Sequence, residues 1–408
     1  MSATVFEQFL STPEMLGVFS EAGVVQAMLD FEAALARAQA GEGLLTDAQA
    51  ATIAGACRVE QLDVPALLAA SGRAGSLAIP LVQQLKACVA QADPEAARRA
   101  HHGSTSQDVI DTAMVLCTRR ALALIDRDLS SLAGALLRLA DAHITTPMLA
   151  RTLMQPAAVT SFGFKIAQWL QPLLRAQARL HEAGQRALQL QLGGGVGTLA
   201  AMGQAGPAVA RRTAALLGLP EPHGAWHTQR DDWVRLACEL GVLCGSLGKL
   251  ARDWSLMGQA EVAELAEPSE AGRGGSTAMP HKRNPVAAMA GLAAAQRAPQ
   301  RVAALLQAMP QEHERGLGNW QAELAEWTGL LLSAHGALKA LADAAAGLQV
   351  DTARMRHNLA LLGDALAPGT DLDEAAAGAG QRADELLQRL RPQAAALAAR
   401  QPWRAWLP

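Results

Sequence analysis

The chain has 408 residues, 50% of them apolar, which is enough for a large core and for more than one domain. Its formal net charge is −3 and it has no lysine- or arginine-rich stripe, so the composition excludes the usual electrostatic footprint of a nucleic-acid-binding protein. No run of about 18 apolar residues is free of charges or helix breakers, and the first residues lack the parts of a signal peptide. We therefore expect neither a membrane span nor secretion.

The five cysteines are scattered along the chain, and none forms a Cys-x-x-Cys pair. This odd, dispersed set is typical of reduced, mostly buried thiols in a cytoplasmic protein. No group of histidine, cysteine and carboxylate residues has the spacing of metal ligands, so we expect no metal site. The chain contains no tyrosine, so a phenol cannot be its catalytic acid.

Residues 1 to about 100 are expected to form an N-terminal domain of shorter helices, broken near residues 41–43, 71–75 and 93–94. A polar run, His101–Asp108, follows this region. Its Thr105 and Ser106 offer hydroxyl and backbone N–H groups just before a helical stretch, which suits a substrate carboxylate. Plain helix capping by either residue is an equally good interpretation, and His101 taken alone is more often structural.

Residues 101 to about 345 carry the strongest pattern, in which apolar residues recur at alternating spacings of three and four. This period, near 3.5 residues, is typical of long helices packed as in a coiled coil. Four such seams occur, over residues 122–139, 166–180, 233–257 and 320–341. Strand signals are nearly absent. The sequence therefore predicts an all-α protein with an elongated central bundle, followed from about residue 346 by short, alanine-rich helices.

Two segments between these seams are polar or glycine-rich. Arg151–Ala157 reads as a loop with a polar edge that opens the helix carrying Phe162 and Trp169. Gln191–Thr198 resembles a phosphate cradle only superficially, because no strand precedes it and no Gly-Lys-Ser/Thr sequence follows. A helix break with close backbone contact is the better interpretation of its glycines.

The run from Gly272 to Pro285 concentrates groups that bind anions and transfer protons on backbone that can move. A serine hydroxyl is a poor acid and base in water, but an ammonium group nearby favours the alkoxide. We therefore expect Ser276 to transfer a proton, with Lys282 and Asn284 binding an anion. The same residues also read as a helix start, with Asn284 as the N-cap and Pro285 as the first helical residue. Further on, Arg315 lies among glycines, where it suits either a carboxylate partner or a solvated turn.

Together these runs resemble the fumarase/aspartase superfamily, which includes the adenylosuccinate and argininosuccinate lyases. The spacing Gly275-Ser276-x-x-Met279-x-x-Lys282-x-Asn284 matches that family's signature loop, and the runs at 101–108 and 152–156 are similar to its two other segments. The resemblance covers residues 10 to about 345. It implies three all-α domains, at residues 1–100, 101–345 and 346–408. It also implies a homotetramer with a twenty-helix core, in which each active site draws on three subunits.

The resemblance implies roles for individual residues. The catalytic set is Ser276, Lys282, Asn284 and His101, and the substrate-binding set is Thr105, Ser106, Thr152, Gln155, Arg315 and Met279. The superfamily's lyases carry a catalytic histidine just after the threonine of the second segment, and this chain has Leu153 there. That departure, with the loop variant Met279–Val286 and the run Glu314–Glu323, is similar to the cycloisomerase branch that acts on carboxylated muconates.

The activity implied by this branch is the addition of a carboxylate oxygen across a conjugated double bond of the same tricarboxylate molecule. The product is a γ-lactone, and no metal or organic cofactor is needed. Two alternatives stay open. One is a lyase that expels an amine and releases fumarate, against which Leu153 argues. The other is a non-catalytic helical scaffold, which would have no need of the intact Ser276, Lys282 and Asn284 set.

Overall fold

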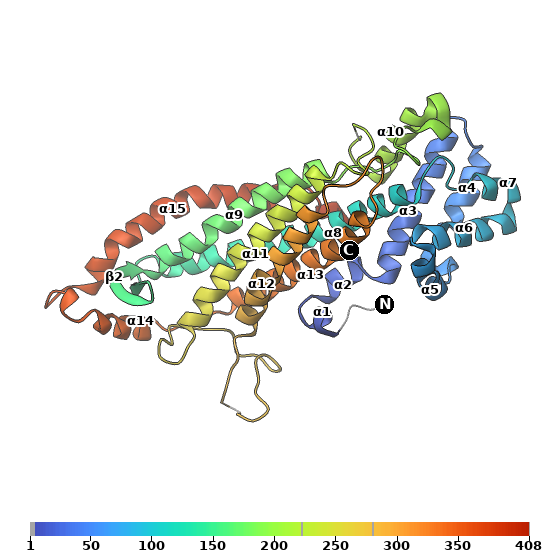
Figure 1. The fold of residues 1–408 in the computed structure, drawn as a ribbon. Coiled ribbons are helices and arrows are strands. Elements are labelled where there is room, and N and C mark those ends of the chain that lie inside the picture. Colours follow the sequence, from blue (N-terminus) through green and yellow to red (C-terminus); the bar gives the residue numbers. More distant parts are fainter. Residues whose placement is uncertain (1–4, 222, 280, 408) are drawn as a thin grey trace.

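The computed structural model describes residues 5–221, 223–279 and 281–407. The described part of the first hundred residues is helical: its first two helices lie against the middle of the bundle, and the others gather at one end of an elongated molecule (Figure 1). These helices are α1 (Val5–Phe9), α2 (Pro13–Val18), α3 (Glu21–Gly41), α4 (Asp47–Ala56), α5 (Val64–Ala74), α6 (Ala78–Ala92) and α7 (Pro94–Arg99). They are not uniformly short, because α3 has 21 residues and packs along α8 and α10.

Long helices running side by side form the body of the molecule (Figure 1). They are α8 (Ser106–Ala142), α9 (Phe162–Ala187), α11 (Asp231–Met257), α12 (Val286–Gln307) and α13 (Asn319–Ala346), with the shorter α10 (Gly206–Leu217) at the end near α3. The predicted seams lie within α8, α9, α11 and α13, and nearly all of their residues are buried. The all-α prediction with a long central bundle is therefore confirmed, because these apolar stripes find cover only against one another.

The tail differs from the prediction of short helices. After α14 (Thr352–Asn358), helix α15 (Leu372–Arg400) runs for 29 residues back along α9 and α8 (Figure 1). Most of α15 is exposed, and only a narrow stripe that includes Ala383, Leu387 and Leu390 faces the bundle. That stripe is too narrow to give a strong periodic signal, and α15 continues through Pro392. The division of the chain into three domains stays a prediction.

A β-hairpin lies where a loop was predicted at residues 151–157. Strand β1 (Pro147–Thr152) pairs antiparallel with β2 (Gln155–Ser161), and α9 begins only at Phe162. The two turn residues, Leu153 and Met154, have φ of 52° and 68°. Such left-handed pairs are characteristic of tight hairpin turns but usually contain Asn or Gly, so the sequence carried no turn signal. A second pair joins β3 (Leu265–Ala266) to β4 (Gln349–Val350).

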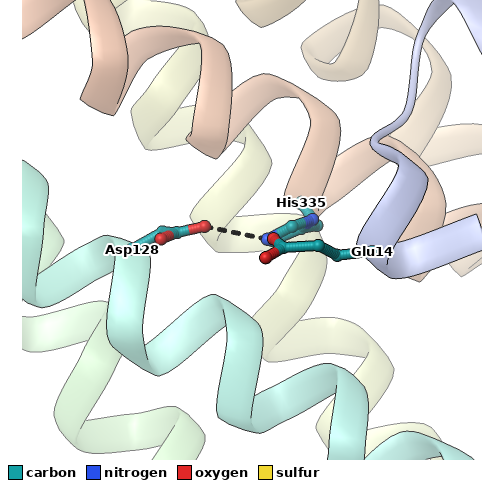
Figure 2. Close-up of side chains that lie close together, drawn as sticks. All are labelled: Glu14, Asp128 and His335. Carbon is teal, nitrogen blue, oxygen red and sulfur yellow. Dashed lines mark hydrogen bonds and ion pairs between the residues drawn. The ribbon is translucent and has the colours of Figure 1, made fainter. Parts of the chain in front are cut away.

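A cluster of charged side chains fastens the N-terminal helices to the bundle (Figure 2). The imidazole Nε2 of His335 on α13 lies 2.9 Å from Asp128 on α8, and its Nδ1 lies 2.9 Å from the hydroxyl of Thr12. Arg127 donates hydrogen bonds to both Asp128 and Glu14. The grouping of Glu14, Asp128 and His335 could suggest a cation site, but the guanidinium already neutralises both carboxylates. We interpret the group of Glu14, Arg127, Asp128 and His335 as a structural ion-pair network and call it the ion-pair staple.

The five cysteines are free thiols, with Cys57, Cys117 and Cys244 buried and Cys88 and Cys238 half-buried. Burial raises the pKa of Cys117 and of Cys244 to about 12, which leaves both inert at neutral pH. Within the described ranges, no helix combines the length and the apolarity that crossing a membrane requires.

Candidate active site

The guanidinium of Arg315 contacts three consecutive residues at the start of α8. Its Nη1 donates to the hydroxyl of Thr105 at 2.5 Å, its Nη2 to the hydroxyl of Ser106 at 3.4 Å, and its Nε to the side-chain oxygen of Gln107 at 3.1 Å. Three of the residues proposed to bind substrate therefore lie together, although Arg315 is 210 positions from Thr105. The positive end of the α8 dipole adds to the arginine's charge, so this cluster suits an anion.

Gln107 connects this cluster to a buried ionic core. Its side-chain nitrogen donates to Asp111 at 3.2 Å and to the carbonyl of His227 at 3.0 Å, which leaves its oxygen for Arg315. Asp111 in turn accepts hydrogen bonds from Arg230 and from the indole of Trp320. Burial would lower the pKa of Arg230, but Asp111 and its second partner, Glu323 on α13, outweigh burial and raise it. The side chain of Gln107 is thus held in place by this buried ionic core, an arrangement that the spacing of residues in the sequence could not reveal.

Asp108 ties the glycine-rich loop to the first turn of α8. Its carboxylate accepts from the backbone N–H groups of Gly193 at 3.1 Å, Gly194 at 2.9 Å and Thr105 at 3.0 Å, and lies 2.7 Å from Nε2 of His227. A Cβ at Gly194, whose φ is +72°, would lie 2.9 Å from the carbonyl oxygen of Gly103. The interpretation of these glycines as a site of close backbone contact is therefore confirmed, and the anion that the loop cradles is the chain's own carboxylate.

His101 belongs to the same end of α8 but is held by another element. Its Nδ1 lies 2.6 Å from the fully buried carboxylate of Glu32 on α3. The backbone of His101 has a φ of 66°. Burial lowers the pKa of His101, but the charge and the hydrogen bond of Glu32 outweigh burial and raise it. The imidazole is therefore oriented by a buried carboxylate, as in sites where histidine transfers protons or donates to anions.

The Ser276 loop projects from the bundle between β3 and α12 (Figure 1). The hydroxyl of Ser276 accepts a hydrogen bond from the backbone of Met279 at 3.1 Å. The backbone N–H of Asn284 donates to the carbonyl of Gly274 at 2.7 Å, and its side-chain amide donates to the carbonyl of Gly275 at 3.2 Å. These contacts close the loop at its neck. Lys282 is exposed at its crown.

The start of α12 differs from the prediction. The helix begins at Val286, and Asn284 is not its N-cap, because its amide is used in the neck of the loop. The carboxylate of Glu267 accepts instead from the backbone N–H groups of Ala287 and Ala288, both at 2.9 Å. The anion-binding end of this helix is therefore occupied by a residue of the chain itself, and substrate has to be bound by the loop side chains.

Thr152 and Gln155 are paired across the turn of the β-hairpin and are both exposed. Between them, Leu153 and Met154 are 96% and 70% exposed. No contact joins these residues to the Arg315 cluster within the described part of the chain, because α8 separates them. With 37 residues at a rise of about 1.5 Å each, α8 is about 55 Å long.

One chain thus brings Thr105, Ser106 and Arg315 together at one end of the bundle. The hairpin with Thr152 and Gln155 lies at the other end, and the Ser276 loop is joined to it through an ion pair between Arg151 and Glu264. Each group holds only part of the predicted site, since Ser276, which is expected to transfer a proton, and Arg315, which is expected to bind a carboxylate, lie apart within one chain. The site as predicted is therefore incomplete in a single subunit.

Comparison with known proteins places this arrangement in a family. The family model for lyases matches residues 8–299. The chain is 49% identical over 350 residues to a 3-carboxy-cis,cis-muconate cycloisomerase of Bradyrhizobium diazoefficiens. The aligned region covers 86% of this chain and 78% of that relative. It is 41% identical over 374 residues to a nitrosuccinate lyase of Streptomyces davaonensis, and the aligned region covers 88% of this chain and 79% of that relative.

The fold has a close counterpart among solved structures. The 3-carboxy-cis,cis-muconate lactonizing enzyme of Pseudomonas putida superposes with a TM-score of 0.85 at 41% sequence identity. The superposition covers 99% of this chain and 97% of that structure. With the signature loop around Ser276 and the α8 cluster already described, these matches show that the chain belongs to the lyase family of the fumarase/aspartase superfamily.

Proposed function

We propose that this protein is a 3-carboxy-cis,cis-muconate cycloisomerase that forms 4-carboxymuconolactone, a step of aromatic-compound degradation. Four relatives with this name are 41% to 49% identical to the chain, and the solved lactonizing enzyme is similar to it in fold. The substrate has three carboxylates, so the site has to bind several negative charges at once. The anion-binding groups at Arg315 and on the Ser276 loop meet that requirement.

The observation that carries the proposal is the environment of Arg315. Within the described part of the chain, its guanidinium is hydrogen-bonded to neutral oxygens only, those of Thr105, Ser106 and Gln107. Protein arginines held this firmly are usually matched by a carboxylate or phosphate. Here the protein orients the guanidinium at a helix N-terminus without neutralising it, which leaves its charge for a carboxylate of the substrate.

In the proposed reaction, one carboxylate oxygen of the substrate bonds to a carbon of the conjugated double bond. The π electrons move to the adjacent carbon and into the carboxylate attached to it, giving a doubly charged aci-carboxylate. Lys282 and Asn284 stabilise this species, and preorganised electrostatic stabilisation of this kind is usually the largest catalytic contribution. Ser276 then donates a proton to the carbon beside the aci-carboxylate, which forms a C–H bond and restores the ordinary carboxylate. The resulting serine alkoxide recovers a proton from solvent. The mechanism uses no metal or organic cofactor.

His101, Thr152, Gln155 and Met279 complete the proposed site. His101 donates a hydrogen bond to a substrate carboxylate through the ring nitrogen that Glu32 leaves free, and Thr152 and Gln155 hold another carboxylate. Leu153, at the tip of the hairpin, cannot transfer a proton. Lactone formation expels no leaving group that needs protonation, so an apolar residue is tolerated there, whereas an amine-releasing lyase would lack its acid.

We further propose that the complete site forms between copies of the chain, in a homotetramer in the cytoplasm. The length of α8 keeps Thr105 about 55 Å from the hairpin of its own chain, so one substrate cannot touch both. Mixing two impaired variants, Ser276→Ala with its low kcat and Arg315→Met with its high KM, tests this directly when activity is assayed at a substrate concentration far below that KM. Reassociated mixtures should recover activity, because some sites then receive both intact segments. A mixture no more active than the variants alone would argue for a site within one chain.

The function itself is tested by incubating the purified protein with 3-carboxy-cis,cis-muconate in the presence of a chelator. Loss of the diene absorbance with formation of the lactone is the expected result. Release of fumarate from a substituted succinate, without lactone formation, would instead favour an elimination lyase; the Streptomyces davaonensis relative is named as a nitrosuccinate lyase.

A further inference from the structure

We infer that Glu264 and Glu267 are positioning residues for catalysis, together forming a bracket, residues 264–267, that fixes both the hairpin and the Ser276 loop to the bundle. This inference rests on the proposed function, because the two segments carry the residues assigned to substrate binding and proton transfer. Neither glutamate belongs to the signature motifs. Each contacts residues that are 20 or more positions away in the sequence.

Glu264 holds the hairpin. Its carboxylate, which is fully buried, accepts from both terminal nitrogens of Arg151, at 2.8 and 3.1 Å, and from the side-chain amide of Asn358 on α14 at 2.8 Å. Arg151 lies on β1 directly before Thr152. Paired, two-pronged contacts of this kind fix geometry as well as contributing energy, so Glu264 determines where Thr152 stands relative to the bundle.

Glu267 holds the base of the Ser276 loop. Its carboxylate accepts from the first free N–H groups of α12, those of Ala287 and Ala288, and pairs with Arg273 at 3.3 Å. These contacts join both ends of the loop. Arg273 lies in the segment that leads into the loop, and Ala287 lies just after the loop, in the first turn of α12. They also satisfy amide groups that α12 cannot pair internally and place a negative charge at the positive end of its dipole.

The bracket itself is anchored. Leu265 and Ala266, between the two glutamates, form β3, which pairs with β4, and the carbonyl of Glu264 accepts from the backbone of Asp351 at 3.1 Å. Leu265 is buried in the core. The two carboxylates therefore extend from one fixed strand in two directions, Glu264 to the hairpin and Glu267 to the loop.

The bracket fixes the base of the Ser276 loop. The neck is closed by the bonds of Asn284 to Gly274 and Gly275, and a Cβ at Gly274, whose φ is +62°, would collide with the carbonyl oxygen of Asn284. Ser276 and Lys282 lie beyond the neck. Because both ends of the loop are held at this base, the base determines where Ser276 stands. Misplacement of a reacting group by about 1 Å costs on the order of 100-fold in rate.

The test compares Glu267→Gln and Glu264→Gln with a matched control, Asp128→Asn. The control removes the charge of the buried Asp128, whose partners Arg127 and His335 lie outside both segments, in the staple of Figure 2. Because Glu264 is fully buried, Arg151→Gln serves as a second variant that breaks the same pair from its half-exposed side. For each protein, kcat, KM, the melting temperature and backbone hydrogen exchange are measured on the full-length chain.

We expect Glu267→Gln to lower kcat by about tenfold or more, because the misplaced loop loses the effective-concentration advantage, with a smaller change in KM. Its hydrogen exchange should quicken in residues 268–285. Glu264→Gln and Arg151→Gln should quicken exchange in residues 147–161 and raise KM. Asp128→Asn should melt earlier but keep its kcat.

Unchanged exchange in these segments, or a kcat for Glu267→Gln equal to that of the control, would overturn the inference. If the wild-type protein forms no lactone, the proposed function fails, and the catalytic role of the bracket fails with it. The exchange data then still decide whether Glu264 and Glu267 hold the two segments.

Discussion

Arg315 and Gln107 are joined by a hydrogen bond of 3.1 Å between the guanidinium Nε and the side-chain oxygen, although they lie 208 positions apart. Gln107 is itself held by Asp111 and by the carbonyl of His227. The arginine is therefore oriented by a neutral partner that is backed by a buried ionic core. A charged partner in the same place would cancel the positive charge that an anionic substrate needs.

The first prediction concerns the geometry of this arginine. Arg315→Lys keeps the charge but loses the planar, three-pronged contact with Thr105, Ser106 and Gln107, so we expect KM to rise by about tenfold. Arg315→Met should raise it further, and kcat should change less in both. The measurement is steady-state kinetics together with the affinity for propane-1,2,3-tricarboxylate, a stable tricarboxylate. Equal affinities for all three proteins would show that Arg315 does not touch the anion.

The second prediction concerns proton transfer. Ser276→Ala should reduce kcat by a factor of about 10²–10⁴, the range typical of a lost general acid. The melting temperature should hardly change, because the hydroxyl makes only a local contact with the backbone of Met279 in a projecting loop. Thr277→Ala, the adjacent exposed hydroxyl, is the matched control and should keep near-normal turnover. Retention of normal turnover by Ser276→Ala would remove Ser276 from its proposed role.

The third prediction concerns the pH dependence of the pair between His101 and Glu32. Glu32 raises the pKa of His101 in the folded protein, so the pair stabilises the charged imidazole. Its contribution is fully present below the ordinary histidine pKa of 6.5 and is lost as the pH rises through the higher folded value. Glu32→Gln should therefore shift the alkaline limb of the kcat/KM profile to lower pH. An unshifted limb would mean that His101 does not govern it.

The fourth prediction concerns the ion-pair staple at Asp128. Burial raises the pKa of Asp128, but hydrogen bonds from His335 and Arg127 outweigh burial and lower it below its ordinary value of 3.8. The bond from Arg127 also lowers the pKa of Glu14 from 4.5. The stabilisation is present above the ordinary pKa values and is lost as the pH falls through the folded ones. Thermal melting of the wild-type protein and of Asp128→Asn should therefore converge on acidification, and a gap that stays constant would contradict this.

Much of the fold could be predicted from the sequence. The seams at 122–139 and 233–257 predicted α8 and α11, because apolar residues at this spacing form one continuous face only if the segment is helical. The hairpin could not be predicted in this way, since Leu153 and Met154 adopt left-handed turn conformations that leucine and methionine rarely take. The length of α15 was missed because its buried stripe is narrow.

For the site, the sequence pointed to residues that are expected to carry chemistry but not to the residues that hold them in place. Thr105, Ser106 and Arg315 were singled out, and the structure brings them together. The partners Gln107 and Glu267 make their contacts through the tertiary fold, across separations that no local pattern encodes. Asn284 was expected to cap α12, but a carboxylate from before the loop takes that position instead.

The most direct test of the central claim, proton delivery next to a carboxylate during lactone formation, is to run the reaction with 3-carboxy-cis,cis-muconate in deuterated water. The product is then examined by proton NMR spectroscopy. We predict a lactone that carries a single deuterium on the carbon beside the carboxylate, with Ser276→Ala forming it far more slowly. A wild-type protein that forms no lactone, or forms one without deuterium at that carbon, would contradict the account.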